Sequence, residues 1–289
     1  MSVALPGPLV TPAWLAEHLA EPGVKVMDAS WYLPAEKRDP AGEFEAAHIE
    51  GAVFFDIDGV RDPDNPLPHM LPSRRIFADE MVRLGISNGD AVIVYDGAGL
   101  FSAPRAWWCM RVFGHDNVAV LDGGLPAWRA ANLPIATLPI ASGPATPGAA
   151  VFEADYRAEL VRDLARMLGN LEQRAEQVVD ARGRGRFEGS EPEIRPGVRS
   201  GHIPGSLNLP YPELIDAADQ TLLPADRLAA AFAERGVDLG RPIVTTCGSG
   251  ISAALLALAL FVCGHDGAAV YDGSWTEWGG RGDTPTEPS

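Results

Sequence analysis

The sequence is poor in cysteine and has no long hydrophobic segment. Its 289 residues include three cysteines, too few for a disulfide framework, and this is typical of a chain in a reducing compartment. The longest apolar stretch, from Ile251 to Cys263, is too short to cross a bilayer and predicts a buried helix. The first residues lack the basic and apolar regions of a secretion signal. We therefore expect a cytoplasmic protein that does not insert into membranes.

Basic residues are also scarce, and the common cofactor motifs are missing. The 23 Lys and Arg residues face 39 Asp and Glu residues, and the resulting net charge of -16 opposes binding to nucleic acid or to anionic membranes. The sequence has neither a Cys-x-x-Cys pair nor a Gly-Lys-Ser phosphate loop. The acidic segment that starts at Asp56 has Arg61 and Leu67 where a calcium loop needs Gly and Glu. We expect no metal and no cofactor.

The chain contains an internal repeat at a spacing of about 150 residues. Gly-His-Asp at 114–116 recurs at 264–266, and Trp128 recurs as Trp278. Between the two copies lies a segment rich in Pro, Gly and Ala, which is typical of a linker. The predicted organisation is an N-terminal domain at 1–137, a linker at 138–150 and a C-terminal domain at 151–289.

Each copy alternates short apolar runs with helical patterns. The predicted strands are 24–27, 91–95 and 118–121 in the first copy and 177–180, 242–245 and 268–271 in the second. The predicted helices include 77–84, 102–112, 226–234 and 252–262. Strands joined by helices favour an α/β fold in which helices flank a central parallel sheet.

Cys247 stands between a predicted strand and a predicted helix, in the loop Cys-Gly-Ser-Gly. Loop amides and a helix N-terminus provide partial positive charge, which is how proteins make a cysteine nucleophilic. The first copy has Asp96 at the aligned position and hence no nucleophile there, so we expect only the second copy to be catalytic. Cys109 and Cys263 lie within apolar helical stretches and are predicted to pack in the core.

These features resemble the two-domain rhodanese family. The resemblance rests on the tandem copies, on Gly-His-Ile-Pro-Gly-Ser at 201–206 and on Cys-Gly-Ser-Gly-Ile-Ser-Ala at 247–253. It implies two tandem rhodanese-like domains and a sulfurtransferase reaction. Sulfur would pass from 3-mercaptopyruvate to Cys247 as a persulfide, with release of pyruvate, and then to a thiol, to thioredoxin or to cyanide.

The resemblance also implies the residues that bind the donor. Arg186 and Arg195 would hold its carboxylate and keto oxygens, because a guanidinium pairs with such oxygens through two hydrogen bonds. The implied substrate-binding loop residues are Gly248, Gly250, Ile251 and Ser252. Family members that use thiosulfate typically carry basic residues where Gly248 and Gly250 stand here.

A proton relay is implied as well. By the resemblance, Asp58 and His69 act with Ser249 to protonate the departing pyruvate enolate, as a hydroxyl oriented by a histidine and a carboxylate can do. His48 and His202 occupy equivalent places in the two copies, which argues for a structural role in both.

The residues alone leave alternatives open. The arginines between 182 and 199 also fit a solvated charge run paired with Glu188, Glu191 and Glu193, with Arg182 in a structural ion pair. His69 also fits a surface histidine. The alternative functions are a thiosulfate sulfurtransferase and a non-catalytic rhodanese-fold binding protein. A phosphatase of related fold would need an arginine at position 253, which is Ala253.

Overall fold

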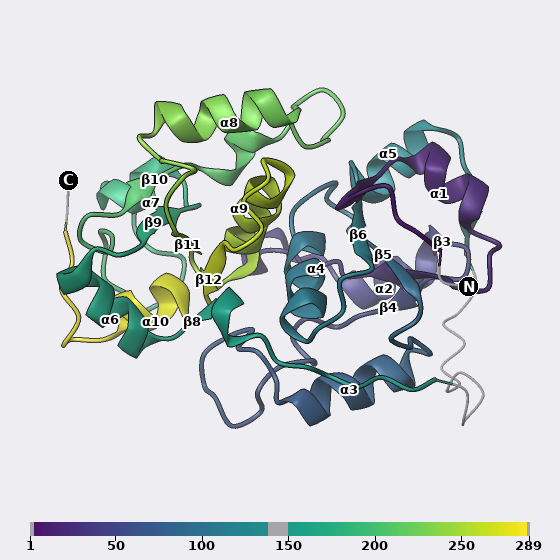
Figure 1. Ribbon diagram of the computed structural model, residues 1–289, viewed down its shortest axis with the longest axis horizontal. Coiled ribbons are helices and arrows are strands. Elements are labelled where there is room, and N and C mark those ends of the chain that lie inside the picture. Colours follow the sequence, from purple (N-terminus) through teal and green to yellow (C-terminus); the bar gives the residue numbers. More distant parts are fainter. Residues whose placement is uncertain (1–2, 138–149, 288–289) are drawn as a thin grey trace. The chain divides into compact units, whose positions relative to one another are not determined.

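The computed structural model describes residues 3–137 and 150–287, and the chain divides into two compact units (Figure 1). The first unit is built from residues 3–62, 71–137 with 150–157, and 216–222. The second unit is built from residues 63–70, 158–215 and 223–287. Each unit thus includes one short segment from the other half of the sequence. Residues 138–149, most of the predicted linker, lie outside the described residues.

The first unit has a five-stranded sheet in the order β1-β6-β5-β2-β4, with every pair of neighbours parallel. Its strands are β1 (Leu9–Val10), β2 (Val24–Asp28), β4 (Val53–Phe54), β5 (Ala91–Tyr95) and β6 (Val118–Leu121). Its helices are α1 (Pro12–His18), η1 (Pro34–Glu36), α2 (Pro40–Ala46), α3 (Arg74–Arg83), α4 (Ala103–Val112) and α5 (Gly124–Ala130). A separate antiparallel pair joins β3 (His48–Ile49) and β7 (Ile135–Ala136).

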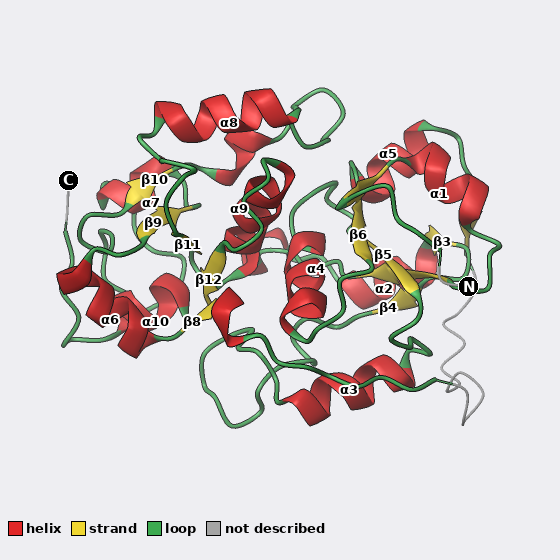
Figure 2. Ribbon diagram, viewed as in Figure 1, coloured by secondary structure: helices red, strands yellow, loops and turns green. Residues whose placement is uncertain are grey.

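The second unit repeats this plan with the sheet order β10-β9-β11-β12-β8, again all parallel. Its strands are β8 (Val161–Arg162), β9 (Gln177–Asp180), β10 (Leu207–Asn208), β11 (Ile243–Thr246) and β12 (Ala269–Tyr271). Its helices are η2 (Ala158–Leu160), α6 (Leu164–Gln173), α7 (Arg184–Glu188), η3 (Tyr211–Leu214), α8 (Ala225–Glu234), α9 (Ile251–Val262) and α10 (Ser274–Gly280). Figure 2 shows helices beside the strands of each sheet. The predicted α/β fold with two parallel sheets is confirmed.

One apolar helix packs on the sheet of each unit. Helix α4 packs against β5 and β6, and α9 packs against β11 and β12. Helix α9 is buried from Ile251 to Leu260, so the predicted buried helix is confirmed.

Cys109 on α4 is buried as predicted. The prediction for Cys263 is wrong: it follows the last residue of α9 and is partly exposed, because at a helix end the side chain leaves the packed interface.

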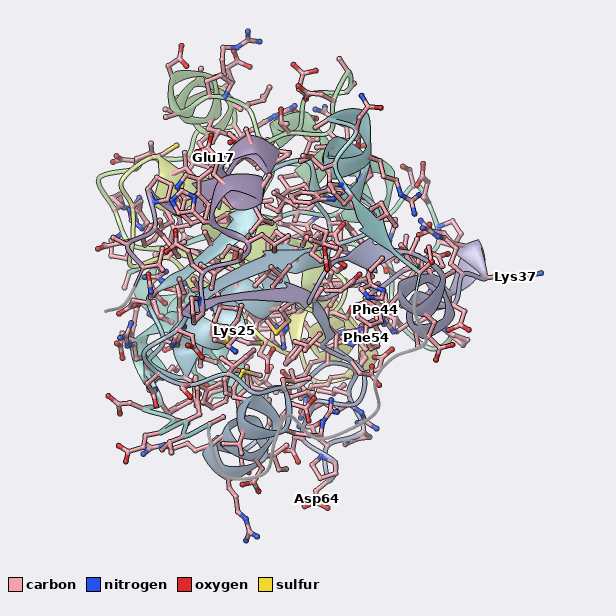
Figure 3. All side chains as sticks on the ribbon, turned by 90° about the vertical axis from the view of Figure 1, so that its right-hand side faces the viewer. Glu17, Lys25, Lys37, Phe44, Phe54 and Asp64 are labelled. Carbon is pink, nitrogen blue, oxygen red and sulfur yellow. The ribbon has the colours of Figure 1, made fainter. Side chains whose placement is uncertain are left out.

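The repeat extends to individual contacts. His48 stacks on Phe44, with Nδ1 2.7 Å from the Phe44 carbonyl oxygen, and Phe44 in turn packs against Phe54 (Figure 3). His202 stacks on Phe187 in the same way, with Nδ1 2.9 Å from its carbonyl oxygen. Both histidines therefore have the structural role predicted for them.

The described residues show no membrane-spanning helix and no metal cluster. None of the helices described is both long enough and apolar enough to cross a membrane. No group of three His, Cys, Asp or Glu side chains arranged to hold a metal ion occurs among residues 3–137 and 150–287.

Candidate active site

The candidate nucleophile Cys247 directly follows β11, and α9 begins four residues later at Ile251. Gly250 has a φ of 82°, in the left-handed region that glycine adopts without strain, and this turns the loop into the helix. The Gly250 amide then donates a hydrogen bond to Cys247 Sγ at 3.1 Å. Cys247 is only 2 % exposed. Its sulfur therefore lies at the positive end of a 12-residue helix.

Helix α10 holds this loop in place. The Trp275 amide donates to the Cys247 carbonyl oxygen at 2.9 Å. Thr276 donates to the Gly248 carbonyl oxygen through its amide at 2.9 Å and through Oγ1 at 2.6 Å. The carbonyl groups of Cys247 and Gly248 thus tie the loop to α10.

Ser274 was not among the predicted site residues, yet it contacts the nucleophile directly. Its Oγ accepts a hydrogen bond from the Cys247 amide at 3.3 Å and donates one to the Tyr271 carbonyl oxygen at 2.8 Å. Its φ of 50° is unusual for a residue other than glycine, and such strain is concentrated at functional sites. The repeat carried a signal for it, because Gly124 takes the same place in the first copy with a φ of 53°.

The first copy shows what this type of loop binds. Asp96, at the position of Cys247, is completely buried. Its carboxylate accepts hydrogen bonds from five backbone amides at 2.8–2.9 Å, those of Ala98, Gly99, Phe101, Ser102 and Ala103. The loop is therefore a cradle for an anion, filled in the first unit by the protein's own carboxylate. In the second unit the aligned side chain is the thiol of Cys247.

The other predicted loop residues line the same turn. Ser249 is buried two residues after Cys247. Ile251 and Ser252 are the first residues of α9, and their side chains are buried as well. The first amides of a helix have no partner within it, and Ile251 and Ser252 supply such amides directly after the loop.

Both predicted donor-binding arginines lie beside Gly248. The Arg186 Nη2 atom is 3.2 Å from the position that a Cβ on Gly248 would occupy. Arg195 Nη1 donates a 3.4 Å hydrogen bond to Thr276 Oγ1, the hydroxyl that bonds the Gly248 carbonyl oxygen. The fold thus brings two guanidinium groups to the loop of the candidate nucleophile from a segment that is distant in the sequence.

Arg182 forms the structural ion pair predicted for it. Its guanidinium donates to both Asp180 carboxylate oxygens, to Oδ2 at 2.6 and 2.9 Å and to Oδ1 at 3.1 Å, and stacks on Trp275 at 4.4 Å. Burial opposes its charge, but the carboxylates of Asp180 and Glu193 outweigh burial and raise the pKa of this arginine. The charged segment at 182–199 is therefore only partly a solvated surface, because the side chains of Arg182 and Glu193 are buried.

The predicted relay is divided between the two units. His69 belongs to the second unit with Ser249, is 3 % exposed and has a φ of 61°. The alternative of a surface histidine is therefore wrong. Asp58 belongs to the first unit, where its Oδ2 accepts a 2.8 Å hydrogen bond from Trp31 Nε1. The relay as a whole stays a prediction.

Comparison with known proteins identifies close relatives. A model of the rhodanese-like domain matches the chain twice, over residues 11–131 and 161–281. The rat 3-mercaptopyruvate sulfurtransferase is 46 % identical over 93 % of this chain and 91 % of its own length. A mitochondrial thiosulfate/3-mercaptopyruvate sulfurtransferase of Arabidopsis thaliana is 44 % identical over 99 % of this chain and 79 % of its own length. The crystal structure of SseA from Escherichia coli, described with 3-mercaptopyruvate sulfotransferases, superposes with a TM-score of 0.82 at 39 % identity, over 93 % of this chain and 99 % of that one.

Proposed function

Because the chain belongs to the rhodanese family, we propose that it is a sulfurtransferase whose donor is 3-mercaptopyruvate. The observation that carries this proposal is the position of Cys247: its sulfur accepts an amide hydrogen bond at the N-terminus of a buried helix, within a loop built to hold an anion. The acceptor that we propose is a thiol, either a small molecule or thioredoxin, with cyanide as a substitute in the assay.

The reaction that this site supports has two displacement steps. In the first, the Cys247 thiolate attacks the donor sulfur, an S–S bond forms, and the C–S bond of mercaptopyruvate breaks. Its electron pair goes to the pyruvate enolate, which takes up a proton; Ser249 and His69 are the groups proposed to supply it. In the second step the acceptor thiolate attacks the outer sulfur of the persulfide and regenerates the Cys247 thiolate.

The choice of donor rests on the charges around the loop. Mercaptopyruvate is a monoanion with a keto oxygen, which suits the two guanidinium groups of Arg186 and Arg195. Thiosulfate leaves as sulfite, a compact dianion, and the glycines at positions 248 and 250 offer it no basic side chain. Since one relative is named for both donors, thiosulfate is the alternative substrate.

We also propose that the protein works in the cytoplasm. All three cysteines are free thiols, which suits a reducing compartment. A C-terminal fluorescent fusion followed by cell fractionation tests this location, and recovery of the fusion in an organelle or in the medium would contradict it.

Mass spectrometry of the donor-treated protein tests the function. One added sulfur should appear on the peptide that contains Cys247, with pyruvate released in equal amount. The Cys247→Ser variant should lose both, because a hydroxyl near neutral pH cannot form the persulfide. Cys263→Ser is the matched control and should keep full activity, because burial raises the pKa of the Cys263 thiol and leaves little thiolate. Sulfur on Cys109 or Cys263 in place of Cys247 would contradict the proposal.

A further inference from the structure

Glu193 links the donor-binding segment to the interior of the second unit. Its side chain is 4 % exposed, although the residues on either side of it are exposed. Oε1 accepts a 2.7 Å hydrogen bond from Arg182 Nη1, and Oε2 accepts bonds from Arg186 Nη2 at 2.5 Å and Nε at 3.2 Å. One carboxylate therefore bridges two guanidinium groups, one structural and one proposed to bind the donor.

The inner end of this bridge is rigid. Arg182 is 1 % exposed, is held by the Asp180 carboxylate at the end of β9, and donates to the Gly201 carbonyl oxygen at 2.9 Å. Its stacking on Trp275 connects it to the helix that holds the catalytic loop. Glu193 is thus fixed at one oxygen by Arg182, a buried residue that is itself hydrogen-bonded to Asp180 and Gly201. The other Glu193 oxygen is therefore held in a defined position.

The outer end of the bridge determines how Arg186 faces the loop. Glu193 occupies the Nε and Nη2 edge of the guanidinium. The Arg186 side chain is 20 % exposed, and its Nη2 lies next to Gly248. Within the described residues Nη1 has no hydrogen bond, so it can donate to an incoming anion. A guanidinium fixed on one edge loses less conformational entropy when the other side binds a carboxylate.

The same bridge sets the charge beside the loop. Two carboxylates, Asp180 and Glu193, balance the two guanidinium groups of Arg182 and Arg186. Since the group is neutral as a whole, it attracts a donor by the direction of its N–H groups more than by net charge. Such a site favours a planar monoanionic carboxylate over a compact dianion.

We propose that Glu193 is the positioning residue of Arg186, and that it makes the site selective for a carboxylate donor over thiosulfate. This inference rests on the proposed function, because Arg186 must be the group that binds the donor. Glu193 itself does not touch the reacting atoms.

The test compares both donors in the full-length protein, with cyanide as acceptor, for wild type, Glu193→Gln, Glu193→Asp and Arg186→Ala. In Glu193→Gln, kcat/KM for mercaptopyruvate should fall roughly tenfold or more, because a charge-assisted hydrogen bond is lost. Thiosulfate turnover should stay the same or rise, because one negative charge beside the loop is gone. The ratio of the two values comes from one preparation, so it does not depend on the folded fraction.

Two further variants separate charge from reach. Glu193→Asp keeps the charge but is too short to bridge both arginines, so mercaptopyruvate turnover should fall without a gain in thiosulfate turnover. Glu191→Gln removes an exposed charge two residues away and should keep the wild-type ratio. If Glu193→Gln keeps the wild-type ratio, whether fully active or weakened equally toward both donors, the inference is overturned. If Arg186→Ala turns mercaptopyruvate over at the wild-type rate, Arg186 does not bind the donor and the inference is overturned as well. If the wild type forms no persulfide from mercaptopyruvate, it is the proposed function that fails.

Discussion

Gly248 is the position at which the donor preference can be changed with the least disturbance of the backbone. Its φ lies outside the left-handed region, whereas Gly250 has a φ of 82° that strains any other residue. The Cβ introduced by Gly248→Arg would lie 3.2 Å from Arg186 Nη2, close enough that the flexible end of Arg186 must move by a few tenths of an ångström. The substitution therefore adds a cation to the loop and crowds one of the donor-binding groups.

Both effects change the donor preference in the same direction. An added positive charge about 5 Å from the leaving group interacts by roughly 3 kcal/mol per negative charge at an effective dielectric constant of about 20. Solvent screening reduces this to about 1–2 kcal/mol. Because sulfite leaves as a dianion whereas the enolate is protonated to the monoanion pyruvate, we expect the ratio of kcat/KM values to move about 5- to 30-fold toward thiosulfate. The displacement of Arg186 should lower mercaptopyruvate turnover further.

Steady-state rates with each donor, with cyanide as the shared acceptor, measure this ratio. Gly89→Arg is the matched control: Gly89 is exposed with no atom within 4 Å of its added Cβ, so this variant changes the net charge without changing the loop. An unchanged ratio in Gly248→Arg, or an equal shift in both variants, would refute the argument that charge beside the loop selects the donor.

Two other substitutions test the proton transfer and a buried carboxyl. Ser249→Ala should lower mercaptopyruvate turnover by about a hundredfold and thiosulfate turnover only slightly, since only the enolate needs a proton; equal losses would mean that Ser249 only shapes the loop. Burial raises the pKa of Asp28 from 3.8 to about 6. Because this folded-state pKa lies above the unfolded value, the stability associated with the protonated carboxyl is complete below pH 4 and is lost as the pH rises through 6. Relative to wild type, Asp28→Asn should therefore gain up to about 3 kcal/mol of unfolding free energy between pH 4 and pH 8, measured by denaturant titration, whereas a pH-independent difference would contradict this.

Local patterns in the sequence predicted the secondary structure well. Strands β5, β6 and β9 have the predicted bounds, and α9 begins one residue before its predicted start. Short β-branched runs and long apolar helical runs differ in period, and this difference is visible without any knowledge of tertiary contacts. The repeat provided a second, independent prediction of each helix and strand.

The proposed nucleophile could also be predicted from the sequence. Cys247, the glycines after it and the aspartate at the same place in the first copy are all local features. The five amides around Asp96 explain why an aspartate stands at this position in the first copy, since a loop that binds an anion can hold a carboxylate of the protein itself.

The sequence by itself thus determined the two parallel sheets, the repeat and the loop that carries the thiol, because each depends on residues close together in the chain. Only the tertiary structure decided that residues 63–70 with His69 join the second unit, that Ser274 bonds the Cys247 amide, and that Glu193 bridges Arg182 and Arg186. In a sequence rich in charges of both signs, a long charged side chain can pair with many different residues. Packing selects one of them, because a buried charge is stable only where an opposite charge and hydrogen-bonding groups meet it.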